Sequence, residues 1–263
     1  MTERRTPVGW RLMFIPPRSG AENMARDIAL MERARGTGEA VLSVYGWERP
    51  TLSFGRNQVA RGCYDLYRIA KEGIGVVRRP TGGRAMMHYR EVTYSVTAPL
   101  GSQVRPREWY SRINRLLVDG LRRGGIDAGE AGLGTPTTPL DSSPCFATPA
   151  PGEVMVHGRK LIGSAQWRYR DTLLQHGSIL IENDQHLIRN FLVADANPAT
   201  PAPATLAAVL GLAPDATFIA ALLFDAVRNL EDPEADSIEE SEVRQAALDG
   251  MAQFENESWT WRR

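Results

Sequence analysis

The sequence predicts an α/β or α+β protein, and three observations support this. A run with helical spacing comes first. A second run with helical spacing follows, with strand-like runs before and after it, and the last third of the chain is mostly helical. This order is typical of a sheet covered by helices. The chain has 263 residues, 43% of them hydrophobic, which is enough to bury a sizeable core. We therefore expect a single domain over residues 1–263, with 184–263 as a mostly helical C-terminal portion.

The first helix is predicted over residues 21–35, where Met24, Ile28 and Met31 recur at helical spacing. Strands are expected over 41–47 and 51–55, joined by a turn at 48–50, and a short strand over 75–80 is stopped by proline. Residues 91–99 alternate apolar and hydroxyl side chains, which predicts a half-buried strand.

A second helix is predicted from Pro106, which suits a first helical turn, to the glycine pair at 124–125. Residues 126–151 are rich in Gly, Pro, Thr and Ser and predict a long loop, which in compact domains is usually functional or disordered.

Three further strands are expected over 153–157, 160–170 and 172–182, with turns at 157–158 and 170–171. After them, 198–204 reads as a connector and 218–230 predicts a helix. A polar helix is expected to start near Ser237, whose hydroxyl would cap it.

Apolar patterning and cysteine usage exclude several classes of protein. No run of 18 apolar residues occurs, so no membrane span is expected, and the N-terminus lacks the apolar stretch of a secretion signal. Two cysteines, Cys63 and Cys145, are too few for a disulfide framework or a cysteine-rich metal site. A cytoplasmic protein with free thiols is the expectation.

The formal net charge is zero, but the charge is divided unevenly. Residues 1–125 carry 22 Lys and Arg against 11 Asp and Glu, and residues 126–263 carry 9 against 20. Either the two halves fold together and their charges mix on one surface, or a basic face receives an acidic partner. Only Lys71 and Lys160 are lysines, so a lysine within a motif stands out.

The run RRPTGGR at 78–84 directly follows a predicted strand. A glycine pair lets backbone N–H groups approach a ligand and form an anion or oxyanion nest, and the flanking arginines would hold a phosphate or carboxylate. A tight turn with solvated arginines is the alternative. The run matches neither a P-loop nor GxGxxG.

A cysteine and a lysine form a second candidate site. Cys145 lies among loop residues, and Lys160 follows fifteen residues later at a strand start. A nearby ammonium lowers the pKa of a thiol, so the pair can act as nucleophile and activator. Cys63, in contrast, is read as a small buried hydrophobe. His88 and His176 are either site residues or hydrogen-bonded structural histidines, and no motif indicates a metal site.

In order and spacing, four motifs resemble the lipoate–protein ligase and octanoyltransferase superfamily: RRPTGGR (78–84), His88 with Glu91 and YSV (94–96), GRKLIGSAQ (158–166) and LLQHGSILIE (173–182). The resemblance covers about residues 10–185. It implies a mixed β-sheet core flanked by helices, like the catalytic domain of biotin and lipoate protein ligases. The small residues of GSAQ would let a ligand chain pass close to a strand.

Within this superfamily the match is closest to the cysteine-dependent octanoyltransferases of the LipM type. Arg84 follows the glycine pair, and Cys145–Phe146 stands in the loop before GRK, where that branch carries its acyl-accepting cysteine. One departure concerns Tyr89, since the family usually has His-Asp where this chain has His88–Tyr89.

The resemblance implies a catalytic domain that moves an octanoyl group from acyl carrier protein, through a cysteine thioester, to a lysine of a lipoyl domain such as a glycine cleavage H-type protein. No cofactor, metal, nucleic acid or membrane is expected. An ATP-dependent lipoate–protein ligase, an amidotransferase acting between lipoyl domains and a non-catalytic lipoyl-domain binding protein are the alternatives. The expected catalytic residues are Cys145 and Lys160, and the expected substrate-binding residues are Arg79, Thr81, Gly82, Gly83, Arg84, His88, Gly163, Ser164, Ala165, Gln166, His176 and Gly177.

Overall fold

The computed structural model describes residues 8–101, 106–132, 146, 152–194 and 201–263. A six-stranded mixed sheet forms its centre, in the order β10-β11-β6-β2-β1-β12. The pairs β1–β2 and β1–β12 are parallel, and the pairs from β2 through β6 and β11 to β10 are antiparallel. The strands of this sheet are β1 (Trp10–Arg18), β2 (Ala40–Trp47), β6 (Glu91–Pro99), β10 (Ile162–Tyr169), β11 (Thr172–Leu180) and β12 (Asp236–Ser237).

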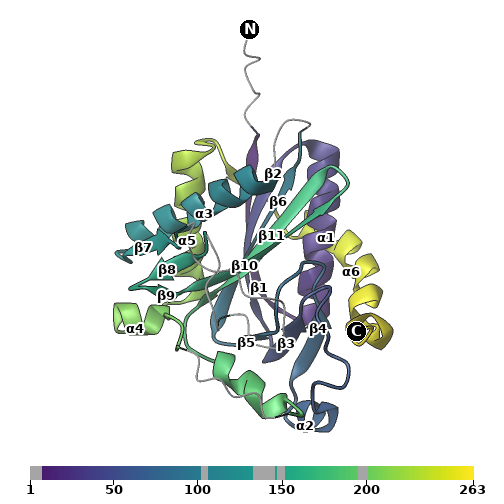
Figure 1. The fold of residues 1–263 in the computed structure, drawn as a ribbon. Helices are drawn as coiled ribbons and strands as arrows, with labels where there is room; N and C mark the ends of the chain where they lie inside the picture. The colour runs from purple at the N-terminus through teal and green to yellow at the C-terminus, as the bar shows by residue number, and fades with distance from the viewer. Residues whose placement is uncertain (1–7, 102–105, 133–145, 147–151, 195–200) are drawn as a thin grey trace.

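Helices cover both faces of the sheet (Figure 1). On one face lies α1 (Gly20–Thr37), with α6 (Ser241–Glu255) packed against it, and on the other lie α3 (Pro106–Arg123) and α5 (Ala216–Leu230). Each face has its own apolar cluster, because alternate side chains of a strand point to opposite sides. This arrangement confirms the predicted mixed sheet flanked by helices.

Two small sheets and several short helices complete the described structure. One sheet has the order β4-β3-β5 and the other β7-β8-β9. Their strands are β3 (Thr51–Phe54), β4 (Gly75–Arg78), β5 (Met86–His88), β7 (Ala128–Glu130), β8 (Val154–Val156) and β9 (Arg159–Lys160). The short helices are α2 (Leu66–Lys71), a 3-10 helix (Gln185–Phe191), α4 (Leu206–Leu210) and α7 (Glu257–Thr260). No described helix has the length and apolar character needed to cross a membrane.

The predicted helices at 21–35, 106–123 and 218–230 and the predicted strands are present to within a few residues. The predicted turns at 157–158 and 170–171 are also confirmed, with His157 at φ 48° and Arg170 at φ 53°. The loop prediction for 126–151 is wrong at its start, because Ala128–Glu130 pair with β8 as a short strand. The predicted connector at 198–204 lies partly outside the described residues.

Strand β6 is buried on both faces, so the prediction of a half-buried strand is wrong. Its apolar residues, such as Tyr94, join the core under α3, and its hydroxyl residues, such as Ser95, lie under α1. The alternation of apolar and hydroxyl side chains is present, but α1 covers the hydroxyl face in place of water. The short hydroxyl side chains leave room for the helix to pack closely over the strand.

Three boundaries also differ from prediction. Ser237 forms a parallel bridge to β1 instead of capping a helix, and the helix starts at Ser241 after Glu240. The single strand predicted at 160–170 is divided at Leu161, because β9 pairs with β8 while β10 joins the main sheet. Strand β1 was not predicted. It contains Pro16 and Pro17, which are tolerated where its register with β2 shifts.

Ion pairs join the basic and acidic halves of the chain. Arg26, buried in α1, contacts Glu240 at 2.8 Å, Arg112 pairs with Glu231, and Arg90 pairs with Asp184. The first interpretation of the uneven charge, in which the two halves fold together and mix their charges, therefore holds for these residues.

Gly55, the residue after β3, determines how closely the turn after β4 approaches β3. A Cβ at Gly55 would lie 1.9 Å from the backbone oxygen of Gly83. Gly55→Ala should therefore lower the free energy of unfolding by more than about 2 kcal/mol, since backbone must move to relieve the overlap. Urea unfolding followed by circular dichroism measures this effect.

Gly36→Ala is the matched control, because nothing lies within 4 Å of its Cβ position in α1. There the helix propensity of alanine should leave stability unchanged or raise it by up to about 1 kcal/mol. Equal stability of the two variants would show that the turn does not depend on this close approach.

Candidate active site

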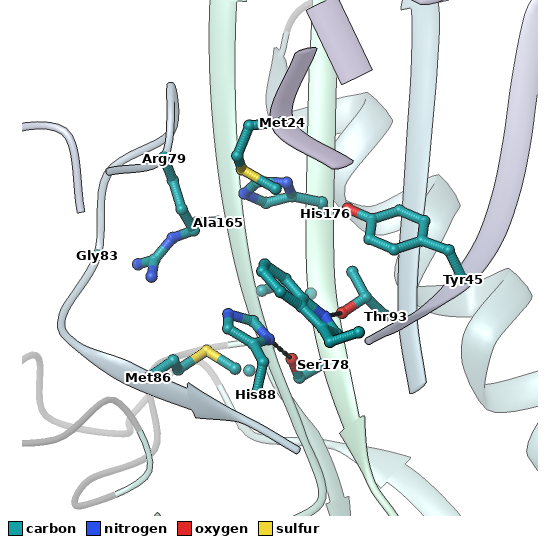
Figure 2. A pocket seen from close by; sticks show the side chains of 14 residues that line it. Met24, Tyr45, Arg79, Gly83, Met86, His88, Thr93, Ala165, His176 and Ser178 are labelled. Atoms are coloured by element: carbon teal, nitrogen blue, oxygen red, sulfur yellow. Dashed lines mark hydrogen bonds between the residues drawn. The ribbon is translucent and has the colours of Figure 1, made fainter. Parts of the chain in front are cut away.

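A pocket of about 380 Å³, including its mouth, lies where the turn after β4 meets the α1 face of the main sheet. Its lining is mostly apolar and aromatic, with two buried histidines (Figure 2). Met24 lies beside His176, and Met86 lies near His88. The lining residues are Met24, Tyr45, Trp47, Arg79, Gly83, Met86, His88, Thr93, Gly163, Ser164, Ala165, His176, Gly177 and Ser178.

The turn at 78–84 is held by its own arginines. Arg79 is buried and donates to the carbonyl oxygens of Ser53, Gly82 and Arg84, at 2.9, 3.2 and 2.9 Å. Arg78 is fully buried and donates to the carbonyl oxygens of Gly55 and Gln58. The sequence suggested arginines that hold an anion, but the hydrogen bonds of Arg78 and these bonds of Arg79 shape the backbone instead.

Gly83 is the point at which this turn reaches the pocket. Its φ of 95° lies in the left-handed region, which glycine adopts without strain. A side chain there would meet the guanidinium of Arg79 at 3.2 Å and the Cβ of Ala165 at 3.8 Å. Gly82 and Arg84 flank Gly83 but do not line the pocket.

A chain of buried hydrogen bonds ties the turn to the sheet and to α1. The Thr81 hydroxyl lies 2.6 Å from Nε2 of His176, whose Nδ1 lies 2.8 Å from the Asp27 carboxylate. Asp27 also accepts from the Tyr45 hydroxyl at 3.2 Å. Burial and the Asp27 carboxylate raise the pKa of Tyr45 well above its ordinary value, so this phenol stays protonated as a donor.

His88 has a similar but separate set of partners. Its Nε2 lies 2.7 Å from the Ser53 hydroxyl, and its Nδ1 lies 3.1 Å from Glu91 and 3.2 Å from Ser178. The ring stacks on Trp47 with centroids 3.9 Å apart. Burial lowers the pKa of His88 below 6.5, although the hydrogen bond to Glu91 opposes this shift. Near neutral pH it is an uncharged group of the pocket wall.

The unusual Tyr89 does not deprive His88 of a carboxylate. Tyr89 is 47% exposed, and its ring lies 5.6 Å from the guanidinium carbon of Arg90. Glu91, three residues after His88, supplies the carboxylate that orients the imidazole. Its oxygen also accepts from Thr93, which in turn accepts from the Trp47 indole at 2.9 Å.

Strand β10 turns one face of GSAQ toward the pocket and the other away from it. Gly163 and Ala165 line the pocket, and the Ser164 hydroxyl lies 2.7 Å from the Tyr94 hydroxyl. Gln166 lies away from the pocket and donates to the Pro106 carbonyl and to Gln175. Gly163, Ser164 and Ala165 all border the pocket, but side chains of a strand alternate between faces, so the Ser164 side chain points to the opposite face, toward Tyr94.

Gly177 brings the two strands of this wall close together. A Cβ there would lie 2.5 Å from the Gly163 carbonyl oxygen and 2.9 Å from the Ser164 hydroxyl. The absence of a side chain leaves the space beside Gly163 open to the pocket, which both glycines line.

Lys160 is buried beside the pocket and does not line it. Its ammonium donates to Glu153 at 2.6 Å and lies 4.9 Å from the centroid of the Phe146 ring. Phe146 packs with Leu180 and with Met86, which lines the pocket. Lys160 is therefore connected to the pocket wall through one aromatic ring.

The two cysteines differ in what the structure describes. Cys145 lies outside the described residues, although its sequence neighbour Phe146 is described and 4% exposed. Cys63 is free and only partly buried, packed against a cluster that contains Tyr64 and Phe191. The prediction of a buried Cys63 thus holds in part.

Sequence reasoning missed the two carboxylates that hold His176 and Lys160. Asp27 follows Met24 by three residues and precedes Met31 by four, so it lies on the apolar face of its helix, where a carboxylate needs a buried partner. Glu153 and Lys160 lie on one face of the hairpin in which Met155 pairs with Lys160. The position of Asp27 on the apolar helix face and the short spacing between Glu153 and Lys160 are both visible in the sequence.

The described side chains that could bind a metal ion are not grouped as in a metal site. No group of three or more His, Cys, Asp or Glu side chains that could hold a metal ion occurs among the described residues.

The lowered pKa of His88 predicts a pH dependence of stability. At pH values between the folded-state pKa of His88 and 6.5, the unfolded chain binds a proton at this histidine and the folded chain does not. The contribution of His88 to the free energy of unfolding is therefore fully present above pH 6.5 and is lost as the pH falls. The stability advantage of the wild type over His88→Gln should therefore be constant above pH 6.5 and shrink below it, by up to about 1.4 kcal/mol per pH unit.

Urea unfolding at a series of pH values measures this difference. His186→Gln is the control, because His186 is exposed on the 3-10 helix. If the difference between the wild type and His88→Gln does not vary with pH, burial does not disfavour the charged form of His88.

Comparisons with known proteins agree with this architecture. The lipoyl protein ligase A/B catalytic domain model matches residues 19–211. A relative from Kyrpidia tusciae named octanoyltransferase LipM is 44% identical over 187 residues, which are 66% of this chain and 67% of the relative. A relative of the same name from Geobacillus kaustophilus is 39% identical over 191 residues, 68% of each chain.

Two solved structures share the fold. A lipoate-protein ligase A bound with ATP has a TM-score of 0.75 at 20% identity, over 97% of this chain and 99% of that one. LipL1 of P. falciparum in complex with lipoate has a TM-score of 0.72 at 16% identity, over 97% of this chain and 74% of that one. With the family match over most of its length and these relatives, the chain belongs to the lipoyl protein ligase A/B catalytic domain family.

Proposed function

We propose that this protein is an octanoyltransferase of lipoate biosynthesis that works through a Cys145 thioester. The observation that carries the proposal is the burial of Lys160 against Phe146, the residue bonded to Cys145, beside an apolar pocket. The relatives named octanoyltransferase LipM support the octanoyl transfer in this proposal. Residues 1–263 would act as one catalytic domain, since α5 and α6 from its C-terminal part pack on opposite faces of the sheet.

The pocket suits an unbranched acyl chain. Met24, Met86 and Trp47 offer apolar surface in its wall, which favours contact with the methylene groups of such a chain. Methionine side chains adapt to a flexible ligand, because they are unbranched and have several rotatable bonds. Among the expected binding residues, Arg79, Gly83, His88, Gly163, Ser164, Ala165, His176 and Gly177 line this pocket.

The reacting groups would stand at the Phe146 side of the pocket. A positive charge on Lys160 favours the thiolate over the thiol, which lowers the pKa of Cys145. Glu153 holds this ammonium in place but also partly offsets its field. Backbone N–H groups near Cys145 or in the Gly82–Gly83 turn would stabilise the oxyanion of the tetrahedral intermediate.

The reaction would proceed in two steps without ATP. The Cys145 thiolate attacks the thioester carbonyl of octanoyl-acyl carrier protein, and the carrier thiolate leaves and takes up a proton. The amine of a lysine on a lipoyl domain, such as an H-type protein, then attacks the acyl-enzyme. The C–N bond forms, the C–S bond breaks, and the amine proton returns to the sulfur. An amide is more stable than a thioester, so this exchange requires no cofactor.

Acyl-enzyme formation tests the proposal. Mixed with octanoyl-acyl carrier protein in the absence of nucleotide, the protein should gain the mass of one octanoyl group. Cys145→Ser should abolish nucleotide-independent transfer to an apo lipoyl domain, because a hydroxyl at ordinary pKa is a far weaker nucleophile than a thiolate. Intact-mass spectrometry follows both reactions.

Cys63→Ser is the matched control, and it should form the adduct and transfer the octanoyl group normally. Full transfer by Cys145→Ser would overturn the thioester mechanism. Modification that requires free octanoate and ATP, with no use of the acyl carrier donor, would instead make the protein a ligase.

Opposite substitutions at the Lys160–Glu153 pair should shift the reactivity of Cys145 in opposite directions. Lys160→Met removes a positive charge and should raise the pKa of the thiol, whereas Glu153→Gln removes a negative charge and should lower it. The pH profile of iodoacetamide alkylation at Cys145 measures both shifts.

Alkylation of Cys63 in the same samples is the internal control and should not change. Identical Cys145 profiles in the wild type and both variants would show that the pair does not act on the thiol.

A further inference from the structure

Arginine and aromatic side chains alternate across the surface beside the pocket. The guanidinium carbons of Arg262 and Arg56 lie 4.1 and 5.5 Å from the ring centroid of Trp259, and that of Arg56 lies 5.1 Å from Trp167. The Trp167 and Tyr169 rings stack at 5.2 Å, and Arg170 lies 5.1 Å from Tyr169. We name this set the arginine–aromatic ladder, composed of Arg262, Trp259, Arg56, Trp167, Tyr169 and Arg170.

The ladder adjoins the pocket at two points. The backbone N–H of Arg56 donates to the Thr81 carbonyl at 2.7 Å, which places Arg56 against the turn that carries Gly83. Trp167 follows Ala165 by two residues on β10 and therefore lies on the same strand face, the one that lines the pocket.

The arginines of the ladder are not neutralised within the described structure. No carboxylate of the described residues lies within 4.0 Å of the guanidinium of Arg56, Arg170 or Arg262, although arginines elsewhere pair with Asp or Glu. Burial and the charges of Arg56 and Arg263 lower the pKa of Arg262. Burial lowers the pKa of Arg78 to about 10, and the positive charges of Arg262, Arg79 and Arg263 add to this shift.

Among the described residues, one hydrogen bond from a ladder guanidinium is seen, from Arg262 to the backbone carbonyl oxygen of Arg56, and each guanidinium carries five N–H donors. A guanidinium that lies flat on an aromatic ring uses its face for the contact, and its N–H groups point outward in the plane. A carboxylate accepts two parallel N–H bonds from such an edge. The ladder thus presents arginines that lie beside aromatic rings and have no carboxylate partner among the described residues. Elsewhere, the ion pairs between the two halves of the chain leave little excess charge at their positions.

We propose that the arginine–aromatic ladder is the docking surface for an acidic protein domain, which binds it through surface carboxylates as it presents its acyl group or lysine to the pocket. The inference rests on the proposed function, because that reaction has two protein substrates. Both must approach the mouth of one pocket in turn, so one surface beside it serves both. The exposed ends of the ladder, Arg170 and Arg262, can reach a partner too large to enter the pocket.

Two acyl donors distinguish the docking of a protein domain from the chemical step. The octanoyl thioester of acyl carrier protein carries an acidic domain, and octanoyl-pantetheine carries no charge. The double variant Arg56→Glu with Arg262→Glu should lower the ratio of the second-order rate constants, carrier donor over small donor, by about tenfold or more at low salt. In the wild type the ratio should fall towards that of the variant at ~1 M salt, where the Debye length is ~3 Å.

Arg244→Glu is the control for charge reversal away from the ladder, because it makes the same change as each single substitution of the double variant, at an exposed position in the first turn of α6. The milder double variant Arg56→Gln with Arg262→Gln should give an intermediate ratio. An unchanged ratio in the double Glu variant, or the same fall in Arg244→Glu, would overturn the docking proposal.

A binding measurement keeps the docking proposal separate from the proposed function. Calorimetric titration with an apo lipoyl domain should give a dissociation constant about tenfold weaker for the double Glu variant than for the wild type and Arg244→Glu. Equal binding by all three proteins would overturn the docking surface even if transfer occurs. Weakened binding without any octanoyl transfer would support the surface and reject the proposed function. Competition by single-stranded nucleic acid but not by the lipoyl domain would assign the ladder to another partner.

Discussion

The structure of the pocket depends on buried hydrogen bonds that hold the turn at 78–84 against the sheet. Thr81, His176 and Asp27 form a buried chain of hydrogen bonds from the turn through β11 to α1. Each of these groups would be costly to bury alone, since an unpaired polar group loses its hydration without compensation. Together they satisfy one another, and the turn, the sheet and the helix must be in register for any of them to be paired. The position of Gly83 at the pocket follows from this constraint.

The apolar pocket and the charged pair next to it are built from separate segments. The pocket uses α1, the turn and the strands β10 and β11, whereas Lys160 and Glu153 belong to the hairpin of β8 and β9. Phe146 links them, because its ring packs on Met86 on one side and under Lys160 on the other. In the proposed reaction, this separation would let an uncharged acyl chain and a charged group occupy neighbouring sites of opposite polarity.

The arginines of the protein have two kinds of partner. Where Arg26, Arg90 and Arg112 meet the acidic second half of the chain, ion pairs bind the elements of the fold together. Around the pocket, aromatic rings take the place of carboxylates as partners of Arg56 and Arg262. An arginine beside an aromatic ring keeps its positive charge, and the proposed docking of an acidic domain would use this charge.

The sequence by itself determined the helices and most strands, because the periods of 3.6 and 2 and the turn residues are local properties. It also identified the motifs that supply most of the pocket lining, including His88, Gly163 and His176. Tertiary structure alone decided that α1 would bury the hydroxyl face of β6 and that Glu91, with Tyr89 exposed, would orient His88. It also decided that Asp27 would meet His176 across 149 residues of sequence. Such pairings depend on which elements pack together, and local periodicity carries no information about a partner so distant in the chain.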